Sequence, residues 1–273
     1  MIVRPPHSVG KGPSALSEGP GGWHPGVVPS LDHREIDAVV FDVDGVVTDT
    51  ARIHAGAWTA VFDDVLRRRA DTASADFEPF TPEDYLAFVD GKSRLDGVQS
   101  FLASRGIELP QGSPDDPPGN ETVCAIGNRK DRSFVDLILR DGVQAFPDTI
   151  ALLDRLAEAH IAVAAVSASR NSAEVLRAAH VIERFAVRVD GVEADRLGLA
   201  GKPDPALFLE AADRLDVRPE RAVVVEDAQA GVEAGRRGGF ALVVGVARAG
   251  SGEALAEHGA DVVVVDLDAV DVR

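Results

Sequence analysis

Two aspartates, Asp42 and Asp44, directly follow a short apolar run and could do chemistry together. The run 39–41 is typical of a buried strand, and Gly45 after the second acid lets the chain turn away. Because side chains alternate along a strand, both carboxylates leave the backbone on the same side. Such a pair could bind a hard cation, or one carboxylate could act as a nucleophile while the other moves a proton.

Two other interpretations of this acidic stretch have to be weighed. The plainer one is a solvated acidic turn at the end of a strand, which the two acids alone do not exclude. A calcium loop of the EF-hand kind fits poorly, because its glycine follows a third oxygen ligand, whereas Gly45 directly follows the second acid. What favours a functional site is the presence of further polar side chains at later expected strand ends, namely Ser167, Lys202, Glu226 and Asp227.

The composition limits the class of protein. With 45% hydrophobic and 27% charged residues, the 273-residue chain is typical of a globular protein with one large domain or two modest ones. The formal net charge of -17 disfavours a nucleic acid or an anionic membrane as partner, because both would repel the chain. The lone Cys124 excludes an intramolecular disulfide and predicts a cytoplasmic location.

Three segments can be predicted from the residue pattern. Residues 1–34 are rich in Gly, Pro, Ser and His without helical or strand periodicity, so we expect a flexible arm. Residues 52–142 are expected to form a helical cap domain, with an exposed Pro-rich loop at about 110–119. Its apolar residues recur at helical spacing in 52–69, 82–90, 95–104 and 130–140.

Residues 35–51 and 143–273 are expected to form the other domain, in which helices alternate with continuous apolar strands. Such strands between helices indicate a parallel sheet that is covered on both faces. The predicted fold is therefore α/β, a doubly wound parallel sheet with the helical cap inserted after its first strand. The later expected strands are 161–166, 185–189, 222–225, 241–246 and 261–265, and the expected helices are 149–159, 172–180, 205–215, 228–237 and 252–258.

The polar groups at these strand ends suit one kind of chemistry. Ligands bind such sheets beyond the carboxyl ends of the strands, where the strand order reverses. Acids there could hold a divalent cation, while the hydroxyl of Ser167 and the ammonium of Lys202 could bind anionic oxygens. Each group also has an ordinary explanation, such as a helix cap or an acid at a helix N-terminus. Together they favour a phosphoryl-transfer site.

These residues give the chain a resemblance to the haloacid dehalogenase superfamily, which covers nearly everything after residue 35. The four motifs of that superfamily are an Asp-x-Asp strand end, a Ser or Thr strand end, a Lys and an acidic pair, and all occur here in order. The segments 42–58, 91–94, 128–131, 166–171, 202–205 and 225–231 further resemble its beta-phosphoglucomutase subgroup. The chain departs from that subgroup at Arg170, at Ala228 and in the Pro-rich loop.

The resemblance implies roles for the strand-end residues. Asp42 would attack phosphorus, and Asp44 would protonate the departing sugar oxygen and later deprotonate the attacking hydroxyl. The implied phosphate-binding residues are Ser167, Ala168 and Lys202. The implied Mg²⁺ ligands are Asp42, Asp44 through its backbone carbonyl, Glu226 and Asp227.

A mutase of this subgroup also needs a second phosphate site, because its sugar bisphosphate intermediate must bind in two orientations. The resemblance implies that Arg94 from the cap forms this site with Ser169, Arg170 and Asn171. Other implied substrate-side residues are Thr50, which would hold Asp44 until the cap closes, and His54, Trp58 and Lys130.

Three functions remain in competition. The resemblance predicts a monomeric, Mg²⁺-dependent enzyme that interconverts beta-D-glucose 1-phosphate and glucose 6-phosphate, with glucose 1,6-bisphosphate as activator. The alternative is a sugar-phosphate phosphatase of the same fold, in which water replaces the second hydroxyl. A non-catalytic partner-binding domain is disfavoured, because Asp42, Asp44, Lys202 and Asp227 are all present.

Overall fold

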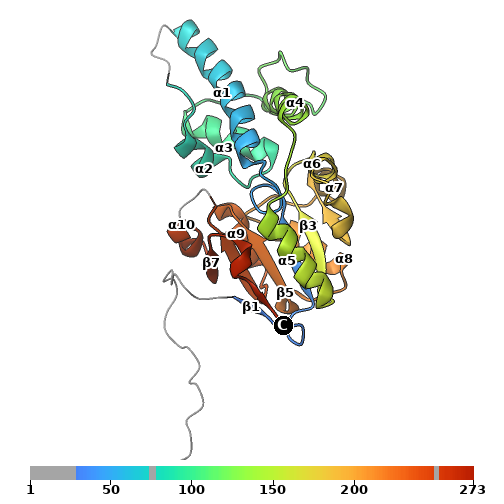
Figure 1. The fold of residues 1–273 in the computed structure, drawn as a ribbon. Helices are drawn as coiled ribbons and strands as arrows, with labels where there is room; N and C mark the ends of the chain where they lie inside the picture. Colours follow the sequence, from blue (N-terminus) through green and yellow to red (C-terminus); the bar gives the residue numbers. More distant parts are fainter. Residues whose placement is uncertain (1–28, 74–77, 249–251) are drawn as a thin grey trace, which may run out of the picture.

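The computed structural model describes residues 29–73, 78–248 and 252–273, which form a sheet-based core and a helical cap (Figure 1). Within these residues the core contains a six-stranded parallel sheet with the strand order β4-β3-β2-β5-β6-β7. Its strands are β2 (Ala38–Asp42), β3 (Ala162–Val166), β4 (Val187–Val189), β5 (Ala222–Glu226), β6 (Leu242–Val246) and β7 (Val262–Val264). The predicted doubly wound α/β fold is thereby confirmed.

The central strand β2 shows why these apolar runs form a sheet that is buried on both sides. Its side chains alternate, so that Val39 and Phe41 join one apolar cluster while Ala38 and Val40 join another on the opposite face. The helices that complete the core are α5 (Pro147–Glu158), α6 (Ser172–Ala178), α7 (Gly191–Leu197), α8 (Ala206–Arg214), α9 (Gln229–Arg237) and α10 (Gly252–Glu257).

The strand order reverses between β2 and β5, because β3 and β4 follow on one side of β2 whereas β6 and β7 follow beyond β5. Phe41 is paired in register with Ala165 of β3 and with Val225 of β5. Asp42 and Glu226 therefore end two adjacent parallel strands at the same edge. Ligands bind doubly wound sheets at this kind of position.

The cap consists of helices that lie over the carboxyl end of the sheet (Figure 1). An aromatic cluster holds them together, because the ring of Phe62 lies 4.9 Å from that of Trp58, 5.1 Å from Phe80 and 4.2 Å from Phe101. The chain enters the cap soon after Asp44 and returns to the core before α5. The cap helices are α1 (Ala51–Ala73), α2 (Pro82–Phe88), α3 (Arg94–Ser104) and α4 (Val123–Asp141).

Helix α4 begins seven residues before the predicted start at 130, at Val123. Thr122 caps it, because its hydroxyl accepts a hydrogen bond from the backbone N–H of Ala125. The first turns of the helix contain Gly127, whose low helix propensity hides the pattern in the sequence. The Pro-rich segment before it is a mostly exposed loop, as predicted.

The predicted extent of the flexible arm was wrong at its C-terminal end. Residues Ser30–Leu31 form strand β1, which pairs in parallel with strand β8 (Asp271–Val272), and Leu31 is buried. The remainder of the predicted arm, residues 1–28, lies outside the described residues. The pairing of β1 with β8 joins residues that are far apart in the sequence, so it leaves no local pattern from which it could be predicted.

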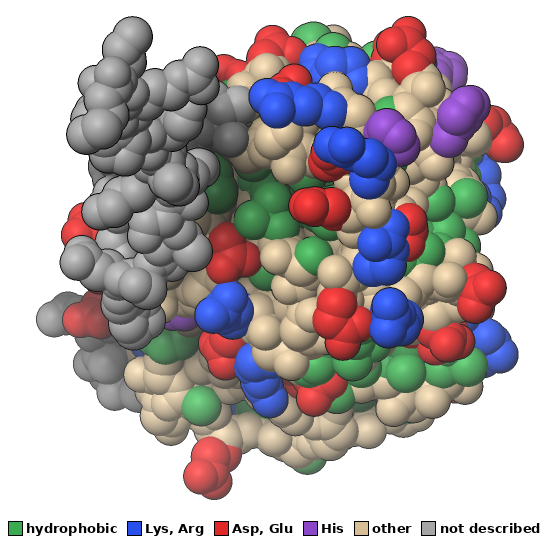
Figure 2. Space-filling view, turned by 90° about the horizontal axis from the view of Figure 1, so that it is seen from below, with side chains coloured by type: hydrophobic (Ala, Val, Ile, Leu, Met, Phe, Trp, Pro, Cys, Tyr) green, Lys and Arg blue, Asp and Glu red, His purple; other side chains and the backbone are tan. Residues whose placement is uncertain are grey.

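The surface opposite the cap carries acidic and basic side chains that are interspersed with one another (Figure 2). In the part of the chain that the structure describes, no helix combines the length and the apolar character that spanning a membrane requires.

Candidate active site

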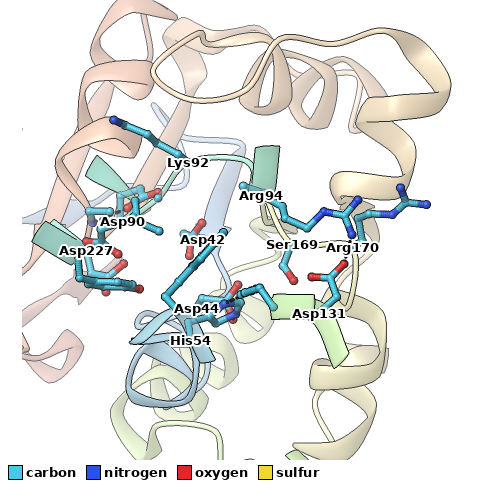
Figure 3. Close-up of a pocket in the computed structure, with 18 residues that line it drawn as sticks. Asp42, Asp44, His54, Asp90, Lys92, Arg94, Asp131, Ser169, Arg170 and Asp227 are labelled. Atoms are coloured by element: carbon cyan, nitrogen blue, oxygen red, sulfur yellow. Dashed lines mark hydrogen bonds and ion pairs between the residues drawn. The ribbon is translucent and has the colours of Figure 1, made fainter. Parts of the chain in front are cut away.

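Side chains from the core and the cap line one small cavity at the carboxyl end of the sheet (Figure 3). Its volume is about 60 Å³, whereas pockets for small molecules usually measure roughly 300–1,000 Å³. The cap therefore lies close over the core. The lining includes Asp42, Asp44, Ala168, Ser169, Arg170, Glu226 and Asp227 from the core, and His54, Trp58, Arg94 and Lys130 from the cap.

Asp42 ends strand β2 and shares a buried cation with Glu226. The ammonium of Lys202 donates to Oδ1 of Asp42 and to Oε1 of Glu226, and all three side chains are buried. Burial raises the pKa of Asp42 well above its usual range; Lys202 opposes this rise, and Glu226 adds to it. The pKa of Lys202 is raised, because the two carboxylates outweigh the effect of its burial. Lys202 therefore remains charged beside Asp42.

Glu226 uses both of its carboxylate oxygens within the protein. Besides the contact with Lys202, its Oε2 accepts a hydrogen bond of 2.7 Å from the backbone N–H of Ala228. A Cβ atom at Gly231 would lie 1.7 Å from Oε1, so only glycine leaves room for the carboxylate there. These contacts favour a role in holding Lys202 over the metal-binding role that the sequence analysis expected.

Asp44 is held by three donors that come from two directions. Thr50 Oγ1 and His54 Nε2 donate to its Oδ1 at 2.5 and 3.2 Å, and Ser167 Oγ donates to Oδ2 at 2.9 Å. Burial alone would raise the pKa of Asp44, but the interactions with His54, Thr50 and Ser167 lower it below its ordinary value. Asp44 is therefore ionised, and two of its three donors lie at or beside the start of cap helix α1.

His54 also connects Asp44 to Lys130, because its Nδ1 lies 2.8 Å from the ammonium of Lys130. Burial and the Lys130 charge lower the pKa of His54, so the ring is neutral near pH 7. This network assigns the ring proton to Nε2, which faces Asp44, and leaves Nδ1 as the acceptor from Lys130. Burial in turn lowers the pKa of Lys130 to about 8. The ammonium lies 4.7 Å from the ring centre of Phe134.

Among the residues expected to bind the distal phosphate, Arg94, Ser169 and Arg170 line the cavity (Figure 3). Nη1 of Arg94 donates to Asp131, and its buried Nε donates to no group among the described residues. Nδ2 of Asn171 is likewise buried without an acceptor in the described part of the chain, but Asn171 does not line the cavity. The guanidinium of Arg170 points away from it and pairs with Asp195 at 2.9 Å.

Of the remaining expected residues, Trp58 lines the cavity, whereas Ser167, Thr50 and Lys202 lie behind the residues that line it. Thr50 contacts the lining through Asp44, Ser167 through Asp44 and the backbone N–H of Ser169, and Lys202 through Asp42 and Glu226. The ring of Trp58 lines the cavity but is mainly part of the cap interior, where it stacks on Phe62.

Sequence analysis missed a carboxylate of the cap that lies on the Asp227 side of the cavity, Asp90 (Figure 3). Burial raises the pKa of Asp90 to about 7, and Glu226 adds to the rise. The next residue, Gly91, has a φ of +69°, and a Cβ atom there would lie 2.9 Å from the Cβ of Ala228. The turn at 90–91 is thus in direct contact with the start of α9. No sequence signal marked Asp90.

Arg248 is a second residue that sequence analysis missed. Its Nε donates to the backbone oxygen of Gly45 at 3.1 Å, and its Nη2 donates to Asp148 and to Thr149, both at 3.1 Å. It therefore fixes the turn after Asp44 to helix α5. A signal existed, because Arg248 closely follows an apolar strand, as Asp42 and Ser167 do.

A magnesium site was also expected at this edge of the sheet. Among the described residues, no three His, Cys, Asp or Glu side chains gather closely enough to hold a metal ion by themselves. Mg²⁺ fits nevertheless, because it usually binds one or two carboxylates together with water and substrate phosphate. Burial raises the pKa of Asp227, and the neighbouring carboxylates of Asp90, Glu226 and Asp42 raise it further. This excess of buried carboxylates suits a hard cation.

Comparison with known proteins gives concordant matches. A sequence model of haloacid dehalogenase-like hydrolases matches residues 36–239. Beta-phosphoglucomutases from Mycobacterium bovis and Mycobacterium tuberculosis are 49% identical over 239 residues, which cover 86% of this chain and 91% of theirs. Beta-phosphoglucomutase from Bacillus subtilis is 33% identical, with 83% of this chain and 88% of that protein covered. The crystal structure of a beta-phosphoglucomutase from Clostridium difficile has a TM-score of 0.67 at 26% identity, covering 85% of this chain and 92% of that one.

Proposed function

This chain belongs to the haloacid dehalogenase-like hydrolase family, in its beta-phosphoglucomutase-like subgroup, and we propose that it interconverts beta-D-glucose 1-phosphate and glucose 6-phosphate. The substrate is supported by the names of relatives that are 49% identical. One structural observation carries the proposal of a mutase. The cap places Arg94 and Lys130 in the same cavity as Asp42 and Asp44 of the core, so a substrate with two phosphates could contact both sides.

Asp42 is the proposed nucleophile. Its carboxylate would attack phosphorus, and the bond between phosphorus and the sugar oxygen would break as an aspartyl phosphate forms. Lys202, held between Asp42 and Glu226, would neutralise the developing negative charge. Glucose 1,6-bisphosphate is the proposed activator that first phosphorylates Asp42. The aspartyl phosphate would pass its phosphoryl group to the 6-hydroxyl of beta-glucose 1-phosphate, which restores the free carboxylate and gives glucose 1,6-bisphosphate as the intermediate. Asp42 would then attack the 1-phosphate of this intermediate, which releases glucose 6-phosphate and forms the aspartyl phosphate again.

Asp44 is the proposed acid and base. In the structure it is ionised, which suits it to accept the proton of an attacking hydroxyl. To protonate a leaving sugar oxygen it must first lose the donors that stabilise its charge. Thr50 and His54 lie at or beside the start of α1, so a movement of the cap would change the protonation of Asp44. We therefore propose that cap movement and proton transfer are coupled.

Arg94 and Ser169 are the proposed contacts for the phosphate that does not react. Arg94 retains a buried donor, Nε, that has no acceptor among the described groups, and a phosphate oxygen would satisfy it. Lys130 would add positive charge near the sugar. The outward orientation of Arg170 makes its participation dependent on a change of rotamer.

Mg²⁺ is the proposed cofactor. Asp42, Asp227 and the backbone carbonyl of Asp44 would hold it, with water and a phosphoryl oxygen as further ligands. When bound, the ion would neutralise charge on the transferring phosphoryl group. Glu226 would support this site indirectly, by holding Lys202.

The small size of the cavity implies that the cap opens to admit substrate and excludes water when it is closed. At about 60 Å³ it cannot contain a sugar bisphosphate, so the cap must open to admit one. Closure around the substrate would exclude bulk water, which otherwise hydrolyses an aspartyl phosphate. All of the proposed residues lie on this chain, and we propose that the enzyme works as a monomer. The lone cysteine supports a reducing cytoplasm as its location.

A product assay tests the proposal. The protein would be given Mg²⁺, beta-glucose 1-phosphate and a trace of glucose 1,6-bisphosphate, and glucose 6-phosphate and free phosphate would be followed together. We expect glucose 6-phosphate to form at least about a hundredfold faster than phosphate, and Asp42→Asn to abolish both. Release of phosphate alone would instead identify a sugar-phosphate phosphatase, which the hydrolase name of the family keeps as the second candidate.

A further inference from the structure

Helix α4 contains a glycine, Gly127, in its interior, where glycine lowers helix stability. Gly127 is buried in the interior of α4, and glycine is less favourable there than alanine. Its packing explains why a side chain is absent. A Cβ atom at position 127 would lie 3.1 Å from Cγ, Cδ and Nε of Arg94. The side chain of Arg94 thus packs against α4 at Gly127, where the absence of a side chain leaves room for it.

Asp131 lies one helical turn after Gly127, on the same face of α4. Its Oδ2 accepts a hydrogen bond from Nη1 of Arg94, and the two side chains are only 22% and 15% exposed. The backbone of Arg94 is fixed as well, because Ser93 caps α3 immediately before it. The arginine is therefore held at its backbone, along its aliphatic part and at its guanidinium.

We propose that Gly127 and Asp131 form a seat that positions Arg94 for the distal phosphate and so favours transfer to sugar over hydrolysis. This inference rests on the proposed mutase function. Gly127 does not line the cavity and would act through Arg94, whereas Asp131 lines it beside Arg94 and would act by holding the guanidinium. A Cβ atom at position 127 would require Arg94 to move by a few tenths of an ångström. Because a misplacement of about 1 Å can lower a rate by about a hundredfold, a smaller shift of the guanidinium is expected to have a smaller but measurable effect.

The variant Gly127→Ala separates this role from a purely structural one. Alanine is the better helix former, so the melting temperature of the variant is expected to equal or exceed that of the parent. For isomerisation, we expect KM for beta-glucose 1-phosphate to rise about tenfold or more. Hydrolysis of acetyl phosphate, which has no second group to bind, is expected to change less than about twofold.

Gly56→Ala in α1 is the matched control. It makes the same change inside a cap helix, but the nearest atom, Cδ1 of Leu137, would lie 3.9 Å from the new Cβ. We expect its KM for isomerisation to match that of the parent. If Gly127→Ala also leaves this KM unchanged, or if it lowers both reactions together with the melting temperature, the seat is refuted.

Asp131→Asn tests the charged half of the seat. We expect it to raise KM for isomerisation, because the guanidinium loses its anchor. A lower KM would show instead that Asp131 competes with the phosphate for Arg94, and would overturn its positioning role.

Arg94→Ala distinguishes a failure of the proposed distal phosphate site from a failure of the seat alone. If that variant isomerises normally, the distal phosphate site of the proposed function fails; if it is impaired while Gly127→Ala is not, only the seat fails.

Discussion

At the scale of single residues, the central feature is a buried chain of polar groups from Asp44 through His54 to Lys130. The carboxylate is ionised, the imidazole is neutral and the ammonium has an unusually low pKa of about 8. Lys130 thus loses its proton more readily than an ordinary lysine, at a position that His54 connects to Asp44, the proposed acid and base. Through this chain, His54 and Lys130 of the cap influence the protonation of Asp44.

A pH dependence follows from Lys130. Because its pKa is lowered from 10.5 to about 8, the group is charged below that pH and loses its charge as the pH rises through it. Values of kcat/KM report the free enzyme, so we expect an alkaline decline centred near pH 8. In Lys130→Arg the decline should move to above about pH 10, since arginine does not lose its proton there. An unchanged alkaline limb in the variant would assign it to another group.

The groups at strand ends, such as Asp42, Ser167 and Lys202, could be predicted, because an apolar run that stops at a polar residue is visible in the sequence. The hydrogen-bond partner of each side chain could not be predicted. Glu226 was expected at the metal, yet both of its oxygens are used by Lys202 and Ala228. Arg170 was expected at the distal phosphate, yet it pairs with Asp195. Such choices depend on rotamers and on tertiary neighbours.

At the scale of elements, the turn that joins α2 to α3 is what brings the cap against the acidic side of the core. Gly91 in this turn has a positive φ and lies against Ala228 at the start of α9. The segment also carries Asp90, next to the carboxylates of the core (Figure 3). A glycine is required here both by the backbone conformation and by the close approach.

Gly91→Ala tests this docking contact, and Gly106→Ala serves as the control. Both residues have positive φ, of +69° and +66°, but a Cβ atom at Gly106 would meet nothing within 4 Å. The positive φ should lower the free energy of unfolding of each variant by about 1 kcal/mol in urea titrations. Gly91→Ala should lose more than Gly106→Ala, because its Cβ would also lie 2.9 Å from the Cβ of Ala228. Only Gly91→Ala should also reduce kcat/KM for isomerisation, by about tenfold or more. An equal effect of both variants on kcat/KM would mean that the close approach to Ala228 is unimportant.

The order and type of most elements could be predicted, because continuous apolar strands and amphipathic helices alternate with regular spacing. The predictions failed where the signal was weak or nonlocal. The start of α4 was masked by Gly127, the short helix α7 was not recognised, and β1 forms only by pairing with β8 at the far end of the chain.

At the scale of the whole molecule, the site exists only where two separately packed parts meet. Asp42 and Lys202 belong to the core, whereas Arg94 and Lys130 belong to the cap. The formal net charge of -17 opposes the approach of an anionic sugar phosphate, so the cations gathered at this junction have to provide the local attraction. A closed cap would both complete the site and limit hydrolysis, which is the property that separates a mutase from a phosphatase.

The most direct measurement is the fate of the phosphoryl group on the enzyme. The protein would be mixed with glucose 1,6-bisphosphate labelled with ³²P and then chased with unlabelled beta-glucose 1-phosphate or with buffer alone. We expect label on Asp42, none on Asp42→Asn, and rapid transfer to sugar phosphate in the sugar chase but slow release as phosphate in buffer. Label that leaves as inorganic phosphate equally fast in both chases, or that never reaches Asp42, would contradict a mutase that works through this residue.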